Sequence, residues 1–214
     1  MNIKKLLLHI LAIGVIIFLP HTEQIPNFLY SIPILFLVWL VLKYSKTTFS
    51  DIGFSLSRFE LRSILIGSIV AACTLAFMQL IFFPVLENFV TLEETDVELY
   101  EFLRESKGQF IFILIMGWLI GGFYEEIVFH GFIFSSLEKI IGGKYATHMS
   151  FALTALIFGI YHIQLGAAGL INALIVGAVY LGVFLYFKRN LWYSIFCHGI
   201  YNTFVITLIY YGYL

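Results

Sequence analysis

Six polar side chains interrupt the apolar runs of this sequence, and their types and spacing could do hydrolytic chemistry. They are Glu125, Glu126 and His130 in one run, His162 in a second, and His198 with Asn202 in a third. An ionisable group in hydrocarbon costs at least ~2.5 to 3.5 kcal/mol, so a cluster of them is a functional hypothesis by default. A carboxylate can take a proton from water, while imidazole and amide groups can donate hydrogen bonds to the oxygen of a reacting carbonyl. The pattern indicates a reaction centre within apolar surroundings.

The spacing divides these residues between roles. His198 and Asn202 are four residues apart, which puts both on one helix face, and Glu126 and His130 have the same spacing and can pair. Adjacent carboxylates lie about 100° apart around a helix, so we expect that Glu125 and Glu126 cannot face the same site. Glu126 would hold His130 as a supporting pair, and Glu125 would face a cavity.

Two chemistries are open for such a cavity. In the first, Glu125 is a general base that deprotonates water, while histidine and asparagine donors stabilise the developing oxyanion. In the second, His162, His198 and Glu125 bind a divalent metal such as zinc, whose bound water is the nucleophile. Either chemistry would hydrolyse an amide.

Other candidate residues have simpler interpretations. Three histidines lie near the ends of apolar runs, where the membrane interface tolerates them, and two aromatic residues and two cysteines inside the runs are expected to be buried packing groups. These residues are His9, His21, His148, Phe158, Tyr161, Cys73 and Cys197.

Composition explains why these residues sit in apolar surroundings. Of 214 residues, 61% are hydrophobic and 12% are charged, against about 25% charged residues in an ordinary soluble domain. The apolar residues form long runs, as expected of membrane-spanning helices of roughly 20 residues. We predict an all-α polytopic helical bundle, a single domain over residues 1–214 with a catalytic core over about 110–211, and no nucleic-acid partner. The seven predicted spans cover about 6–19, 25–42, 63–83, 110–137, 146–166, 168–187 and 191–211.

The positive charges predict an orientation. Lysines and arginines accumulate in cytoplasmic loops, and ten of the twelve fall on one side of the predicted spans, so the N-terminus is expected inside the cell and the C-terminus outside. The ten are Lys4, Lys5, Lys43, Lys46, Arg58, Arg62, Lys139, Lys144, Lys188 and Arg189; the other two are Arg104 and Lys107. Arg104 lies within an acidic stretch around 87–105 and Lys107 follows it; in this stretch a capping-box spacing from Thr91 to Glu94 predicts a short surface helix.

At these motifs the sequence resembles the CAAX prenyl endopeptidase and bacteriocin-processing family of intramembrane proteases, also called the Abi family. The family pattern is Glu-Glu-x-x-x-Arg, then Phe-x-x-x-His, then His-x-x-x-Asn or Asp. Here the motifs begin at Glu125, Phe158 and His198, and His130 stands where the family has arginine. The resemblance covers about 117–202. It implies that Glu125 activates water, that His162 is its partner, and that His198 and Asn202 line the oxyanion site.

The resemblance implies an intramembrane endopeptidase that cuts a membrane-associated peptide or protein. We expect it in a bacterial plasma membrane, embedded in the lipid bilayer, and acting near the cytoplasmic half. Two other functions stay open, the first supported by the shorter histidine at 130 and the second by the carboxylates and histidines within the apolar runs. One is a non-catalytic membrane scaffold or bacteriocin self-immunity protein, and the other is a small proton-coupled transporter.

Overall fold

Every predicted span overlaps a helix in this computed structural model, which describes residues 2–22, 28–90 and 98–214; the first residues of the predicted span 25–42 lie outside them, and the span 146–166 runs past the end of its helix at Tyr161. Within those residues there is no strand, which confirms the all-α fold class. The single helices are α1 (Ile3–Phe18), which continues in a 3₁₀ turn to His21, α2 (Ser31–Ser45), α8 (Ala146–Tyr161), α9 (Gly166–Tyr186) and α10 (Leu191–Tyr210). Two longer segments are composite. Leu61–Glu87 consists of α3 (Leu61–Phe77), a π turn and α4 (Phe83–Glu87), and the other is Lys107–Ile141. A further short helix, α5 (Glu98–Glu105), forms in the acidic stretch, whose predicted capping box lies outside the described residues.

Four of these segments are long and apolar enough to cross a membrane: Ile3–His21, Leu61–Glu87, Lys107–Ile141 and Ile163–Tyr186. The helices Ser31–Ser45 and Ala146–Tyr161 are apolar but shorter. The chain is therefore built as an integral membrane protein, while the count of seven spans and the cytoplasmic N-terminus stay predictions.

Large apolar side chains cover much of the outer surface, as expected where lipid tails replace water. Examples with more than half of their area exposed are Leu7, Leu11, Phe18, Leu65 and Leu80. The expectation that both cysteines are buried is wrong for Cys73, which is exposed on α3, whereas Cys197 on α10 is buried. An apolar residue in a membrane protein gains nothing by turning away from lipid, so hydrophobicity alone does not predict burial.

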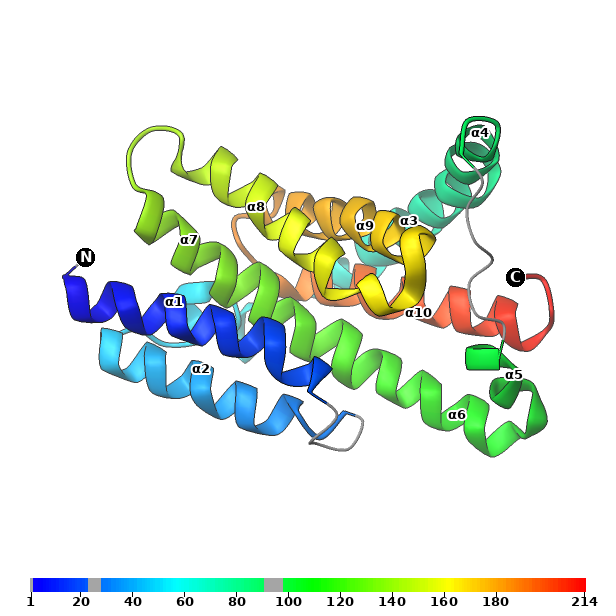
Figure 1. Ribbon diagram of the computed structural model, residues 1–214, viewed down its shortest axis with the longest axis horizontal. Helices are drawn as coiled ribbons and strands as arrows, with labels where there is room; N and C mark the ends of the chain where they lie inside the picture. Colours follow the sequence, from blue (N-terminus) through cyan, green and yellow to red (C-terminus); the bar gives the residue numbers. More distant parts are fainter. Residues whose placement is uncertain (1, 23–27, 91–97) are drawn as a thin grey trace.

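The longest helix carries both carboxylates through the centre of the bundle (Figure 1). It consists of α6 (Lys107–Met116), a wide π-type stretch from Gly117 to Ile133, and α7 (Phe134–Ile141). Ser106 caps its start by accepting a hydrogen bond from Gln109 N at 3.2 Å. The π geometry usually occurs as a single turn, often at functional sites, and here it extends over 17 residues.

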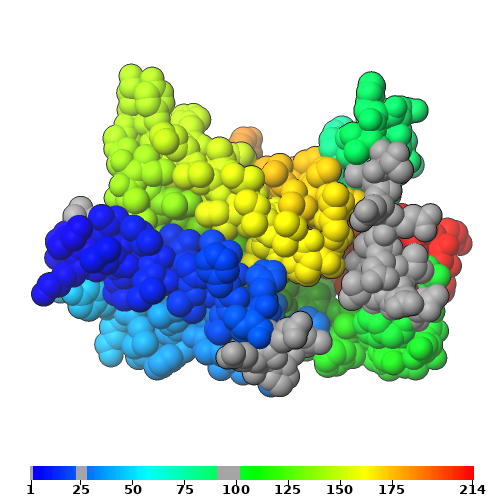
Figure 2. Space-filling model, viewed as in Figure 1, coloured from blue at the N-terminus to red at the C-terminus, as the bar shows by residue number. Residues whose placement is uncertain are grey.

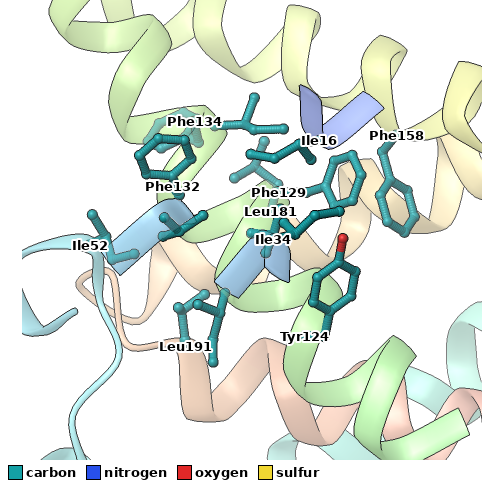
Figure 3. Packing of buried hydrophobic residues seen from close by; sticks show 14 of the residues in the cluster. Ile16, Ile34, Ile52, Tyr124, Phe129, Phe132, Phe134, Phe158, Leu181 and Leu191 are labelled. Atoms are coloured by element: carbon teal, nitrogen blue, oxygen red, sulfur yellow. The ribbon is translucent and has the colours of Figure 1, made fainter. Parts of the chain in front are cut away.

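The core packs around the second half of this wide stretch (Figure 3). Phe129, Phe132 and Phe158 are almost fully buried, and the rings of Phe129 and Phe158 meet edge to face with centroids 5.2 Å apart. Phe158 and Tyr161 are therefore packing groups, as predicted.

A set of polar contacts clamps the start of α10. The Arg58 guanidinium donates to the carbonyl oxygens of Lys188 and Arg189 at 2.8 and 2.9 Å. Asn190 Nδ2 donates to Arg58 O at 2.9 Å, and Asn190 Oδ1 caps the helix by accepting from Trp192 N. These contacts fix where α10 begins, and thereby the position of its side chains along the axis of the bundle.

The two ends of the bundle differ in charge. At the basic end, α1 begins, α2 and α7 end, and α10 begins; there Lys5 Nζ donates to Ser45 O, and Arg189 pairs with Glu138 at 2.7 Å. At the opposite end, which we call the mouth end, α6 begins, α8 turns into α9 and α10 finishes (Figure 1). Arg104 of α5 donates there to Ile209 O at 2.9 Å. The α4 segment projects away from the rest of the molecule (Figure 2).

Candidate active site

Glu126 is a buried anchor for two imidazoles. Its Oε2 lies 2.8 Å from His130 Nδ1, which is the predicted pair, and its Oε1 lies 2.9 Å from His198 Nδ1 on α10. Glu126 and His130 are fully buried, and His198 is 6% exposed. An ionised carboxylate only accepts hydrogen bonds, so both Nδ1 atoms must be the donors. This contact leaves the lone pair of neutral His198 on Nε2.

Glu125 meets the other nitrogen of that same ring. Its Oε2 lies 3.8 Å from His198 Nε2 and 3.8 Å from His162 Nε2. The His162 ring is fixed as well, because its Nδ1 donates to Phe158 O at 2.8 Å. Both histidines, when neutral, therefore direct Nε2 lone pairs toward Glu125.

This convergence has a chemical consequence. Three acceptors face one another at distances too long for a direct hydrogen bond, with no donor among them. A group that supplies protons or positive charge would stabilise them, and a water molecule, which donates to two of the three, is the simplest one. The arrangement suits binding and polarisation of water beside a carboxylate base.

The two carboxylates point in different directions, as expected from their spacing: Glu125 lines the cavity and Glu126 does not. The sequence did not predict that both would lie beside the same ring, one at each nitrogen of His198. The helix-wheel argument considered one helix alone, whereas this ring comes from a second helix.

Asn202 joins the site one helical turn beyond His198. Its Nδ2 donates to Gly117 O at 3.1 Å, which occupies one of its two amide protons and leaves the other for a ligand. The two helices approach closely because residue 121 is glycine. A Cβ at Gly121 would collide with Asn202 Nδ2 and would lie 3.0 Å from His198 Nε2.

A cavity of about 330 Å³ connects these groups. Glu125, His162, His198 and Asn202 all line it, whereas Glu126 and His130 lie behind its wall. The volume is within the range of ligand pockets, roughly 300 to 1,000 Å³. The structure thus brings the six predicted residues together in two groups, four at the cavity and two that support them.

Sequence reasoning missed Tyr180 of α9, which also lines the cavity. Its ring stacks on His198 with centroids 4.6 Å apart and planes 24° apart, so it limits how that imidazole can tilt. It is one of 13 tyrosines in the chain and stands in a uniformly apolar run, so nothing in the sequence marks it.

The remaining histidines lie away from the cavity. His9 is buried between Ser136 Oγ at 2.8 Å and Ser45 Oγ at 3.1 Å, so it is a hydrogen-bonded structural residue at the basic end. His21 packs edge to face on Tyr161, and His148 is exposed.

The donor chemistry at the cavity is compatible with a metal. Neutral imidazoles whose Nδ1 atoms are held by a carboxylate or a carbonyl are typical metal ligands, and His162, His198 and Glu125 are the residues that would hold an ion. As the side chains stand, the described part of the chain forms no group of three His, Cys, Asp or Glu residues that could do so. Metal dependence stays a prediction.

Among the comparisons with known proteins, the comparison with protein families found a match. Residues 107–204 match the family described as type II CAAX prenyl endopeptidase Rce1-like, which confirms the resemblance drawn from the three motifs. The matched segment contains all six site residues. No curated protein and no solved structure matched the chain.

Proposed function

We propose that this chain, which carries an Rce1-like domain of the type II CAAX prenyl endopeptidases over residues 107–204, hydrolyses a peptide bond of a membrane-associated peptide or protein with water activated by Glu125. The observation that carries the proposal is the position of Glu125 Oε2, 3.8 Å from the Nε2 atoms of both His162 and His198 on the wall of a cavity.

The reaction begins with a water held between Glu125 and the two imidazoles. Glu125 takes one proton as the water oxygen bonds to the peptide carbonyl carbon, and negative charge develops on the carbonyl oxygen. The free amide proton of Asn202 donates to that oxygen, beside the His198 ring, which Glu126 holds from behind. Glu125 then returns its proton to the leaving nitrogen as the carbon–nitrogen bond breaks.

Each supporting residue has a definite task. Glu126 and Tyr180 hold the His198 ring, the Phe158 carbonyl oxygen holds His162, and His130 supplies a second hydrogen-bond donor to Glu126. His130 stands where the family pattern has arginine and makes one contact to the Glu126 carboxylate at 2.8 Å. A bound divalent ion on His162, His198 and Glu125 would supply a more acidic water at the same place.

The test compares three purified proteins in detergent on a panel of quenched membrane peptides. Glu125→Gln keeps the shape of the side chain but removes the base, and cleavage should fall by about 10²- to 10⁴-fold, the scale of general base catalysis. Glu87→Gln removes an exposed carboxylate on the projecting α4 and should cleave like wild type. Equal cleavage by wild type and Glu125→Gln would sink the assignment.

A chelator arm addresses the metal. Loss of wild-type cleavage on chelation, restored by added zinc, would assign the ion to this site. Chelator-resistant cleavage would favour direct activation of water by Glu125.

A further inference from the structure

The cavity occupies only one half of the bundle. Its walls come from the long helix between Ile113 and Glu125, from the end of α8 and the α8 to α9 turn, from α9 as far as Tyr180, and from α10 between His198 and Ile209. Phe28 and Tyr30, just before α2, complete it. These segments run between the site and the mouth end (Figure 1), so the described lining of the cavity extends toward that end.

The basic residues occupy the other half. The contacts of Lys5 with Ser45, of Arg58 with Lys188 and of Arg189 with Glu138 gather the segments that carry ten of the twelve lysines and arginines. Within residues 2–22, 28–90 and 98–214, no lysine or arginine lines the cavity. Because positively charged loops remain in the cytoplasm, this charge distribution predicts that the basic end is the cytoplasmic one and that the mouth end faces away from the cytoplasm.

We propose that the cavity opens to the extracytoplasmic face and that the substrate segment enters from there. The proposal differs from the expectation that the site acts near the cytoplasmic half, because the lining residues extend toward the mouth end. The identity of the entering group as a substrate rests on the proposed function, whereas the direction of the opening does not.

The length of α8 explains how the site stays below the outer surface. This helix has 16 residues, or about 24 Å at 1.5 Å per residue, while the hydrocarbon core is about 30 Å thick. A helix that starts at the cytoplasmic surface therefore ends within the outer half of the bilayer. His162, directly after α8, lies at this recessed turn.

The lining also defines the chemistry of what enters. Among the described residues that line the cavity, Glu125 is the one carboxylate, and beyond it the walls toward the mouth are formed largely by side chains such as Ile113, Met116, Val205 and Ile209. The cavity therefore suits an uncharged, apolar stretch of a secreted or membrane-anchored peptide, close to where that peptide leaves the bilayer on the outer side. An extended strand would fit better than a helix, whose peptide groups are already hydrogen-bonded within the helix.

Cysteine labelling tests the direction without any need for cleavage. Starting from Cys73→Ala, which leaves only the buried Cys197, Leu165→Cys places a thiol on the cavity wall at the α8 to α9 turn, and Val205→Cys places one on the opposite wall. Lys144→Cys places one on the exposed turn at the basic end. A membrane-impermeant maleimide is applied to intact cells and to inverted vesicles, with detergent-solubilised protein as the measure of full labelling.

The expected result is labelling of Leu165→Cys and Val205→Cys in intact cells, with Lys144→Cys labelled only in inverted vesicles and the Cys73→Ala parent in neither. The reverse pattern, or cavity cysteines that react only after detergent is added, would overturn the proposal. Repeating the experiment in Glu125→Gln separates it from the proposed function, because the pattern should persist when the base is gone. Outward labelling with no effect of Glu125→Gln on cleavage would leave the opening in place and refute the mechanism.

Discussion

Gly121 offers the sharpest perturbation of the site, because a single methyl group there meets two reactive side chains. A Cβ at this position would overlap Asn202 Nδ2, and His198 Nε2 would have to move from 3.0 Å to at least the 3.4 Å at which ordinary contact begins. The adjacent Gly122 is a matched control. Its Cβ would meet Gly199 Cα at 3.4 Å and Ile195 O and Trp118 Cε3 at 3.5 Å, all within ordinary contact.

The two alanine variants should therefore differ in stability and in cleavage rate. Overpacking costs about 1 to 3 kcal/mol, against about 0.5 to 1 kcal/mol gained by alanine over glycine in a helix. Gly121→Ala should lose up to about 2 kcal/mol of stability on balance, and cleavage should fall by about 10²-fold, the effect of misplacing reacting groups by ~1 Å. Gly122→Ala should unfold at or slightly above the wild-type temperature and keep its activity.

Initial rates on a peptide that wild type cleaves, with thermal unfolding in the same detergent, measure both quantities. The reasoning fails if Gly121→Ala cleaves and unfolds like Gly122→Ala, since the close approach of the long helix to α10 would then not be what positions His198 and Asn202.

Two further predictions concern charge. His130→Leu removes one of the two imidazole donors to the buried Glu126 carboxylate and should lower stability by about 2 kcal/mol, the scale of a hydrogen bond to a charged group; His148→Leu, at an exposed position, is the control, and equal unfolding temperatures would contradict the role given to His130. In the loop before α3, Asp51 accepts hydrogen bonds from Thr48 Oγ1 and N at 2.8 and 2.7 Å, which holds the pKa of its carboxyl below the ordinary value. The contribution of that carboxylate is present above the pKa of the unfolded chain and is lost as the pH falls through the lower folded value, so Asp51→Asn should lower the unfolding temperature at neutral pH and have little effect in acid.

The helices and the site residues could be predicted from the sequence for one physical reason. A helix that spans a bilayer requires a long apolar run, so these runs indicate the helices. An ionisable group inside such a run is energetically costly, so it indicates a functional residue. Glu125, Glu126, His162 and His198 were found in this way. The pairing of Glu126 with His130 followed from spacing within one helix.

What could not be predicted depends on how one helix is rotated against another. The contact of Glu126 with His198, the stacking of Tyr180 on that ring and the narrow approach at Gly121 all arise between helices. The exposure of Cys73 was missed for a related reason, because in a membrane an apolar side chain is equally stable against lipid and against protein.

Because apolar side chains are equally stable against lipid and against protein, the polar contacts at the start of α10 have a further role. In water, an amphipathic helix finds its rotational phase by turning its apolar stripe inward, but a helix that is apolar on most sides has little such preference in lipid. A slip of one residue at Asn190 would turn α10 by about 100° and carry His198 and Asn202 out of the cavity together. Arg58 opposes that slip by donating hydrogen bonds to the carbonyl oxygens of residues 188 and 189. These bonds form at the charged surface, where they favour one rotation of α10 over others that would be equally stable in hydrocarbon. The reaction centre is thus aligned from outside the apolar layer, and the mouth end is left free to vary without disturbing it.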